Sequence, residues 1–285
     1  MKKYILGSMI LAGVSLSFNA EAQLLKKIQN AAQNAAQSAA QKSASEKAEN
    51  ASSNAMEGLL GGMMQPAPTE SEYNFSGYMI MEITSTDKKG KTDEPMHMNY
   101  LLSKDTQFMG MAFTDPKNPS THTATVIDQK NEAMVLFLED GGKKSSMAMK
   151  MDLNKIQNMV DEEAEETIEK PDYEITKTGN TKQILGYTCE EYLVKSEDGE
   201  GHYWVSEKPI EGFSMFSPQS NPMVSNKTVE KYYSHFSNAP KGTFLEMLFK
   251  STDGSVTDMK VIELELNSPT SFAIADYPNM MSGNN

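Results

Sequence analysis

From residue 73 onward, hydrophobic and polar residues alternate with a period of two, which is the pattern of half-buried β-strands. The first alternating segment covers residues 73–84, where Tyr73, Phe75, Met79, Met81 and Ile83 are the apolar members. Similar segments follow at residues 96–102, 106–113, 121–127, 132–139, 144–151, 173–177, 243–250, 257–266 and 271–275. Short turns such as Asp140-Gly141-Gly142 join most neighbours, so the pattern predicts an antiparallel meander of ten or eleven strands.

Residues 184–206 form the clearest predicted hairpin, with Asp198-Gly199 as its two-residue turn. In this register Val194 faces Tyr203 and Tyr192 faces Val205, so one face of the ribbon is apolar. The other face pairs Lys195 with His202, Leu193 with Trp204, and Glu191 with Ser206, and it also carries Cys189.

Two segments have a helical composition. Residues 23–57 are rich in alanine and glutamine, which are good helix formers, and Ala31, Ala35 and Ala39 fall in one helical row. This helical arm, with a linker at residues 58–72, has three interpretations: a solvated arm, self-association through residues 23–55, or docking of Leu24, Leu25 and Ile28 on a surface. A second helix is predicted at residues 152–168, and its acidic end is interpreted as a solvated face. The long connection at residues 207–242 is predicted to hold a short helix at residues 227–236.

The first 22 residues have the three parts of a secretory signal peptide: a charged start, a short apolar run and an Ala-x-Ala ending. Cleavage is predicted after Ala22, and no cysteine lies near that site to carry a lipid anchor. No later run approaches the roughly 20 apolar residues of a membrane helix. We therefore expect a periplasmic, envelope or secreted protein, with a β domain at residues 73–277 and a disordered tail at residues 278–285.

The charge and the absence of arginine argue against two classes of function, the binding of nucleic acid and of anionic lipid headgroups. The net charge is −13, and all 26 basic residues are lysine. Because arginine is the preferred residue for bidentate phosphate and base contacts, an acidic chain without it is a poor candidate for binding nucleic acid or anionic headgroups. The single cysteine cannot form an internal disulfide, and Cys189 is predicted to be a buried, unreactive thiol.

The stretch Tyr173-x-Ile175-x-Lys-x-Gly179, followed by Ile184-x-Gly186-Tyr187-x-Cys189-x-x-Tyr192 and Trp204-Val205-Ser206, resembles a family of exported Bacteroidota proteins. The block at residues 134–151 and the closing Phe272-x-Ile274-x-x-Tyr277 resemble it too. The family is known as domain of unknown function 4412, and the resemblance covers roughly residues 73–277. It implies a curved antiparallel sheet like that of the periplasmic LolA/LolB-type lipoprotein carriers, an open half-barrel with helices against its hollow face. The family has no established catalytic residues, so none is carried over.

No arrangement of nucleophile and base is visible in the sequence. The four histidines, His97, His122, His202 and His235, are scattered, and each is interpreted as an exposed strand or loop residue. No Cys/His cluster has zinc spacing. We therefore predict no enzyme activity, no cofactor and no metal site.

Methionine is the one unusual component, with 22 residues. Met96 and Met98 flank His97, but alternation places them on the other face from it, which weighs against a copper(I) site built from soft thioether ligands. A methionine-rich core is the simplest interpretation. Alternatively, adaptable methionine side chains line a surface that accepts an apolar ligand such as a lipid or acyl chain. The candidate ligand-binding residues are Met79, Met81, Met96, Met98, Met147, Met149, Tyr192 and Tyr203.

Overall fold

The computed structural model describes residues 66–105, 107–115, 118–152, 154, 158, 161, 173–212, 225–235 and 239–279. The expected signal peptide, the helical arm at residues 23–57 and residues 280–285 of the expected tail lie outside this part of the chain. Of the expected helix at residues 152–168, Asn154, Asn158 and Asp161 are described and are helical. The Asp161 carboxylate accepts a hydrogen bond from the Ser225 backbone N–H at 3.0 Å.

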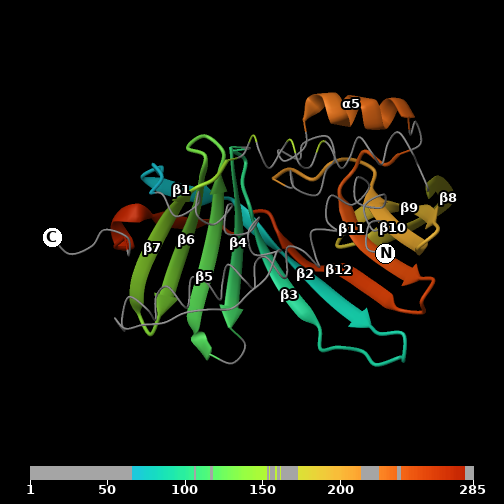
Figure 1. The fold of residues 1–285 in the computed structure, drawn as a ribbon, viewed down its shortest axis with the longest axis horizontal. Helices are drawn as coiled ribbons and strands as arrows, with labels where there is room; N and C mark the ends of the chain where they lie inside the picture. Colours follow the sequence, from blue (N-terminus) through green and yellow to red (C-terminus); the bar gives the residue numbers. More distant parts are fainter. Residues whose placement is uncertain are drawn as a thin grey trace, which may run out of the picture.

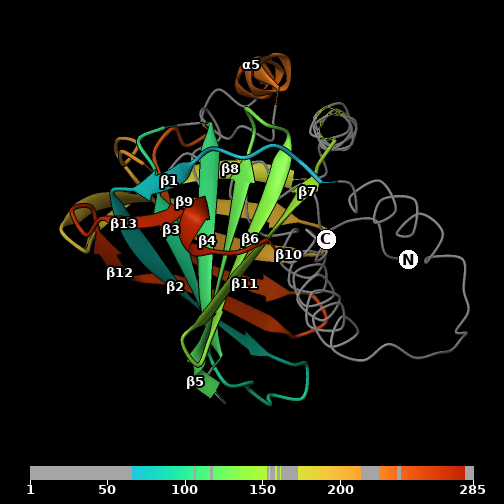
Figure 2. The same cartoon turned by 90° about the vertical axis from the view of Figure 1, so that its left-hand side faces the viewer.

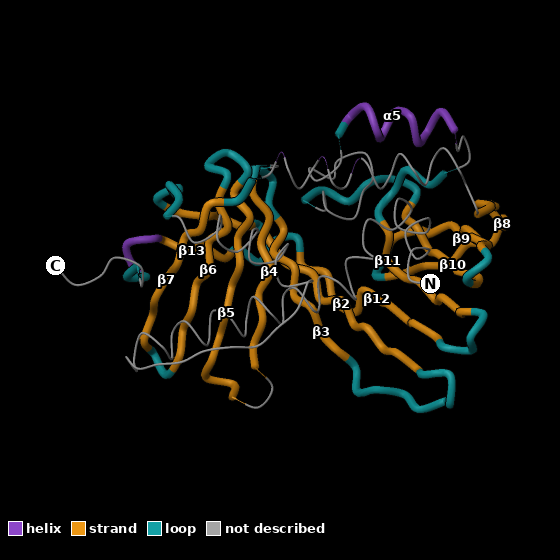
Figure 3. The backbone as a smooth tube through the Cα atoms, in the orientation of Figure 1, coloured by secondary structure: helices purple, strands orange, loops and turns teal. Residues whose placement is uncertain are grey.

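An eleven-stranded antiparallel sheet forms the body of the protein (Figure 1). Its strands are β2 (Gly77–Thr86), β3 (Met96–Leu102), β4 (Phe108–Asp115), β5 (Asn118–Asp128), β6 (Ala133–Asp140), β7 (Lys143–Lys150), β8 (Tyr173–Ile184), β9 (Tyr187–Ser196), β10 (Gly199–Ser206), β11 (Phe244–Ser251) and β12 (Val256–Glu265). The order across the sheet is β7-β6-β5-β4-β3-β2-β12-β11-β10-β9-β8, so two consecutive meanders join where β2 pairs with β12. β7 and β8 remain at opposite edges, and the sheet is curved without closing into a barrel (Figure 3). The predicted mainly β, open and curved fold is confirmed.

A short ribbon of two strands, β1 (Glu72–Phe75) and β13 (Thr270–Ala273), forms a second sheet and leads into the 3-10 helix η2 (Ile274–Asp276). In Figure 2 this ribbon lies in front of β4–β7, while β8–β11 lie behind those strands. The prediction of one continuous strand at residues 73–84 was wrong, because the chain changes partners at Ser76, whose backbone N–H bonds to the Leu102 carbonyl at 2.8 Å. Gly77 makes the change of partner feasible, since a Cβ there would lie 1.9 Å from the Glu265 carbonyl oxygen.

The predicted register of the hairpin at residues 184–206 was wrong by two residues. The turn is Glu197-Asp198, and Tyr203 lies opposite Tyr192, with His202 opposite Leu193. Gly199 is needed for close approach rather than for the turn, since a Cβ there would lie 2.2 Å from the Lys250 carbonyl oxygen on β11. A shift of two residues keeps every side chain on its face, so the predicted separation of the two faces holds.

The strand predicted at residues 173–177 is longer in the structure, although Gly179-Asn180 is typical of a turn. β8 runs through these residues with a bulge between Lys177 and Thr181, and Gly179 has a φ of 85° there. The chain instead reverses at Leu185-Gly186, where both φ angles are positive, as a two-residue hairpin turn requires.

Two hydrophobic clusters stabilise the sheet on opposite faces. The ribbon cluster lies between the β1–β13 ribbon and β3–β7 and contains Tyr73, Phe75, Leu101, Ala124, Val126, Ala133, Val135, Phe137, Ala148 and Tyr277. The helix-side cluster gathers buried residues of β2, β3 and β9–β12 with Ile210, Ala239 and Tyr232 of the helix α5 (Asn226–His235). α5 agrees within a residue with the helix expected at residues 227–236. In the described part of the chain, no helix has both the length and the apolar character needed to span a membrane.

The segment expected to be a linker, residues 58–72, includes described residues that are attached to the sheet. Pro66 forms an antiparallel bridge with Met149 on the free edge of β7, and Glu70 pairs with Lys130 at 2.8 Å. At the other end of the described chain, the Pro278 carbonyl accepts a hydrogen bond from the Ser146 N–H at 2.9 Å. Both ends of the β domain therefore lie along β7.

Candidate functional site

All eight predicted ligand-binding residues lie on one face of the main sheet, which we call the methionine face. The strand registers establish this step by step, because residues directly opposite each other in neighbouring strands point to the same side. Met81 lies opposite Met98, and Tyr192 lies opposite Tyr203. A row of directly opposite residues leads across the strands from Met147 to the same face: Leu136, Thr125, Met111 and Tyr100. Tyr203 is connected to it through Met247, Met259, Ile83 and Met96.

Burial divides the methionine face into two parts. Met79, Met81 and Tyr203 are fully buried, Tyr192 is nearly so, and all four belong to the helix-side cluster. We call this the packed half, since Ile210, Tyr232 and Ala239 complete the same cluster. In contrast, Met96 is 39 % exposed, and Met98, Met147 and Met149 are half-buried.

The register adds residues to the less covered part that the sequence did not single out as site residues. Between the strands that carry Met98 and Met147, the same face presents Met109, Met111, Phe113, Met134, Leu136 and Leu138. We call the methionine face of β4–β7, together with Met96 and Met98 of β3, the open half, since Tyr100 and Leu102 of β3 belong to the helix-side cluster. Within the open half, Met109, Met134 and Leu136 are buried. The alternation of β4 and β6 was visible in the sequence, but only the strand order shows that these residues lie between the predicted ones.

A copper-type site around Met96 and Met98 is not assembled in the described residues. His97 lies on the opposite face, where its Nε2 is 3.0 Å from a Glu82 carboxylate oxygen. The Met98 sulfur accepts a hydrogen bond from the Tyr100 hydroxyl at 3.6 Å. Within the described residues, no group of three or more histidine, cysteine or acidic side chains could hold a metal ion.

Cys189 is buried on the opposite face, as predicted. Burial raises the pKa of its thiol to about 11, and the thiol donates a weak hydrogen bond to the Tyr187 carbonyl at 3.6 Å. A thiol that stays protonated is a poor nucleophile, so Cys189 contributes packing.

Glu191 and His202 form a polar network on the same opposite face. One oxygen of Glu191 accepts hydrogen bonds from Thr178 and Asn180, both at 2.7 Å, and the other lies 2.8 Å from His202 Nδ1. Burial alone would raise the pKa of Glu191, but these hydrogen bonds outweigh it and lower the pKa below its usual value. Because Thr178 and Asn180 lie within the bulge of β8, the network holds the edge strand in place.

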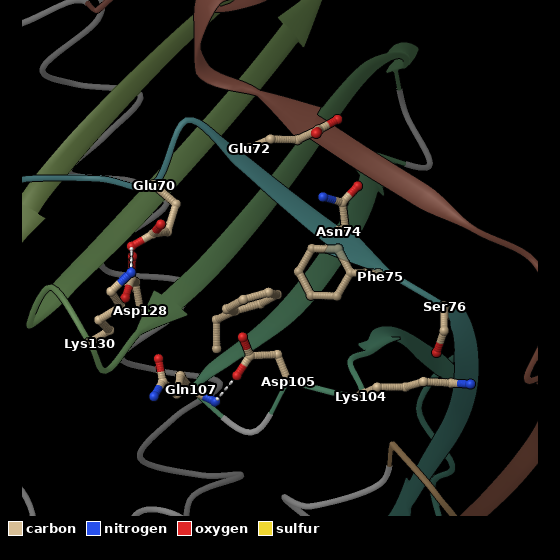
Figure 4. Close-up of a pocket in the computed structure, with 11 residues that line it drawn as sticks. Glu70, Glu72, Asn74, Phe75, Ser76, Lys104, Asp105, Gln107, Asp128 and Lys130 are labelled. Carbon is tan, nitrogen blue, oxygen red and sulfur yellow. Dashed lines mark hydrogen bonds and ion pairs between the residues drawn. The ribbon is translucent and has the colours of Figure 1, made fainter.

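A cavity of about 530 Å³ lies beside β1, away from the methionine face (Figure 4). It is lined by Glu70, Glu72, Asn74, Phe75, Ser76, Lys104, Asp105, Gln107, Phe108, Asp128 and Lys130, and so contains none of the eight predicted residues. Its deepest carboxylate, Asp128, is fully buried and accepts a hydrogen bond from the Tyr73 hydroxyl at 2.7 Å and another from the Asn131 amide at 2.7 Å. Three of its four acidic residues, Glu70, Asp105 and Asp128, already have partners within the protein, so we interpret this cavity as structural.

Residues 75–274 match the model of a family described as a domain of unknown function, DUF4412. The chain belongs to this family. The match confirms the resemblance carried by the motifs around Gly179, Cys189 and Trp204. No curated protein matches the chain.

Several solved structures are similar to parts of the chain. A structure of PNGF-II shares 14 % identity and a TM-score of 0.26, with 66 % of this chain and 27 % of that chain covered. MucB, solved in complex with MucA(peri), shares 8 % identity at a TM-score of 0.24, with 66 % and 50 % covered. The Mycobacterium tuberculosis lipoprotein LppX shares 7 % identity at a TM-score of 0.22, with 69 % and 88 % covered. The match spans about a quarter of PNGF-II, and at these TM-scores none of the likenesses supports a functional argument.

Proposed function

We propose that this protein is an exported, non-enzymatic binding protein that holds an apolar ligand, a lipid or acyl chain, on the open half of the methionine face. The observation that carries the proposal is the difference in burial along one continuous apolar face. The packed half is completed by Ile210, Tyr232 and Ala239, whereas Met96, Met98, Met111, Met147 and Met149 keep part of their surface exposed.

The side-chain chemistry of the open half supports binding rather than simple exposure. Methionine has three rotatable bonds and a polarizable sulfur, so it adapts to ligands of different shape. Fully burying one such side chain contributes about 1.5–3 kcal/mol, and contiguous exposed apolar surface is typical of binding sites. The four predicted residues in the packed half, Met79, Met81, Tyr192 and Tyr203, then act as the rigid wall next to the site.

The proposal is tested first on protein purified from its own cell envelope, by native mass spectrometry and lipid extraction. A co-purifying apolar molecule supports it. Its absence, together with no saturable binding of palmitate to the purified protein, would contradict it.

A pair of variants locates the site. Met98→Gln combined with Met147→Gln places two polar groups in the open half, and we expect the affinity for palmitate to fall about tenfold or more. The matched control is Leu248→Gln, a partly buried residue of β11 on the opposite face, directly opposite His202. Equal affinities of the double variant and the control would place the ligand elsewhere.

The alternative is an interaction protein that self-associates through residues 23–55. It is favoured by the alanine row at Ala31, Ala35 and Ala39. Deletion of residues 23–65 separates the two functions: loss of an oligomer with palmitate binding retained supports both, and an unchanged monomer removes the alternative.

A further inference from the structure

The open half is organised in rows that run across β4–β7, because the registers of these strands place residues directly opposite one another. The outermost row, near the turn between β6 and β7, contains Thr121, Asp140 and Lys143. The next row contains Phe113, Thr123, Leu138 and Ser145, the third contains Met111, Thr125, Leu136 and Met147, and the innermost contains Met109, Ile127, Met134 and Met149.

Polarity falls steadily from the outermost row to the innermost. The outermost row is wholly polar, with Asp140 directly opposite Lys143 and accepting a hydrogen bond from the Thr121 hydroxyl at 2.8 Å. The second row has two hydroxyl side chains among four residues, the third has one, and the innermost has none.

Exposure changes in the same direction. Phe113 in the second row is 39 % exposed, whereas Leu136 in the third is 4 % and Met134 in the innermost is 5 % exposed. β3 repeats the trend beside these rows, from Met96 at 39 % to Tyr100 at 5 %. The open half is therefore most accessible at the end near Met96 and Phe113, while in the innermost row only Ile127 and Met149 keep part of their surface exposed.

We propose that the open half binds a single-chain amphiphile lengthwise along β4–β7, with its polar end at the outermost row and the end of its chain at the innermost row. This inference rests on the proposed function and adds a ligand class and an orientation to it. The end of the chain would be buried against Ile127 and Met149, which keep part of their surface exposed in the innermost row. The polar end would stay beside the hydroxyls of Thr123 and Ser145 and the Lys143 ammonium, avoiding the cost of burying an unpaired polar group. Successive rows are two residues apart, so the four rows span about 20 Å at roughly 3.4 Å per residue.

The orientation is testable on the full protein carrying ¹³C-methyl methionine, with stearate that has a nitroxide either near its carboxylate or near its chain end. Volume-conserving Met→Leu variants assign the signals. We expect the chain-end nitroxide to attenuate the methyl signals of Met134 and Met149 at least twofold more than that of Met96. The nitroxide near the carboxylate should show the reverse pattern. Ascorbate, which reduces the nitroxide, should restore all intensities.

The outcomes separate the two proposals. If neither nitroxide attenuates any methionine of the open half, the proposed function fails and the inference fails with it. If both attenuate these methionines but with equal or inverted patterns, the open half binds apolar chains and the orientation alone is overturned.

A second measurement uses two adjacent lysines that point to opposite faces. Lys143 lies in the outermost row, whereas Lys144 lies over the Tyr277 ring at 5.0 Å on the other side of the sheet. Lys143→Gln should weaken stearate binding about threefold or more, and Lys144→Gln should leave it unchanged. Equal effects of the two variants would overturn the placement of the polar end.

Discussion

Strands β4–β7 build two very different surfaces from alternate residues of the same segments. On one side, Phe137 stacks on Phe272 at 4.9 Å and meets the Tyr277 ring edge-on at 5.0 Å, beneath the β1–β13 ribbon. Small residues such as Ala124 and Ala148 make room for these rings. On the other side, the same strands present flexible methionines, of which Met111, Met147 and Met149 keep part of their surface exposed.

The difference shows how one sheet can be rigid and adaptable at once. Aromatic rings held in fixed edge-on and stacked geometries form a close-packed core, and a tight core resists changes of shape. Methionine packs without a preferred geometry. We infer that the ribbon cluster supplies the stability that lets the open half stay under-packed.

Removing a ring from the ribbon cluster should have the largest effect. Phe137 is 1 % exposed, so Phe137→Ala should lower the free energy of unfolding by about 3–5 kcal/mol through lost burial and a cavity. Urea denaturation followed by circular dichroism measures this loss. A loss below about 1 kcal/mol would show that the cluster is not the rigid element of the comparison.

Adding a methyl group at Gly110, beside the same cluster, should cause the next largest loss of stability. A Cβ on Gly110 would lie 2.6 Å from the Phe75 ring and 3.0 Å from the Leu101 Cβ. Gly110→Ala should therefore cost about 1–3 kcal/mol, as overpacking does in close-packed interiors. Recovery of stability in the Gly110→Ala, Phe75→Leu double variant would confirm the steric cause, and simple addition of the two losses would refute it.

Tyr73 gives the ribbon cluster a pH dependence of its own. Burial, followed by the hydrogen bond to Asp128, raises the pKa of Tyr73 well above its ordinary value of about 10. Since the folded state keeps the proton that the unfolded state loses, the stabilisation is complete below about pH 10 and is lost as the pH rises further. Tyr73→Phe should lower the free energy of unfolding by about 1–2 kcal/mol at neutral pH. Above about pH 10, the stability of this variant should fall less steeply with pH than that of the unchanged protein. An equally steep fall in urea denaturation at several pH values would assign the pH dependence to other groups.

Changing shape on the methionine face should have the smallest effect. Met147→Leu conserves volume, so we expect a change in unfolding free energy below about 1 kcal/mol. A change of shape in the ribbon cluster, Phe137→Leu, which also removes volume, serves as the contrast and should cost clearly more. Similar losses at both positions would mean that the open half is packed as specifically as the ribbon cluster.

The sequence predicted the strands well because alternation is a local signal. The eight candidate residues were assigned to apolar sides of their strands from alternation alone, and the registers place all of them on one face. The hairpin register failed because Gly199 resembles a turn residue, while its absent side chain is required by β11, which lies more than forty residues later in the chain. The break at Ser76 was missed for the same reason, since β1 pairs with β13 near the other end of the domain.

By itself, the sequence determined the antiparallel β class, the family, the buried state of Cys189 and the side of each strand on which the methionines lie. These properties depend on side-chain alternation and on motifs within one or two strands. Only the tertiary structure decided that Met79 and Met81 are covered, because their cover includes Ile210, Tyr232 and Ala239, which lie outside the strands that they pack on. It also aligned β4–β7 into rows whose polarity falls toward one end, since register between strands depends on contacts that no single segment contains.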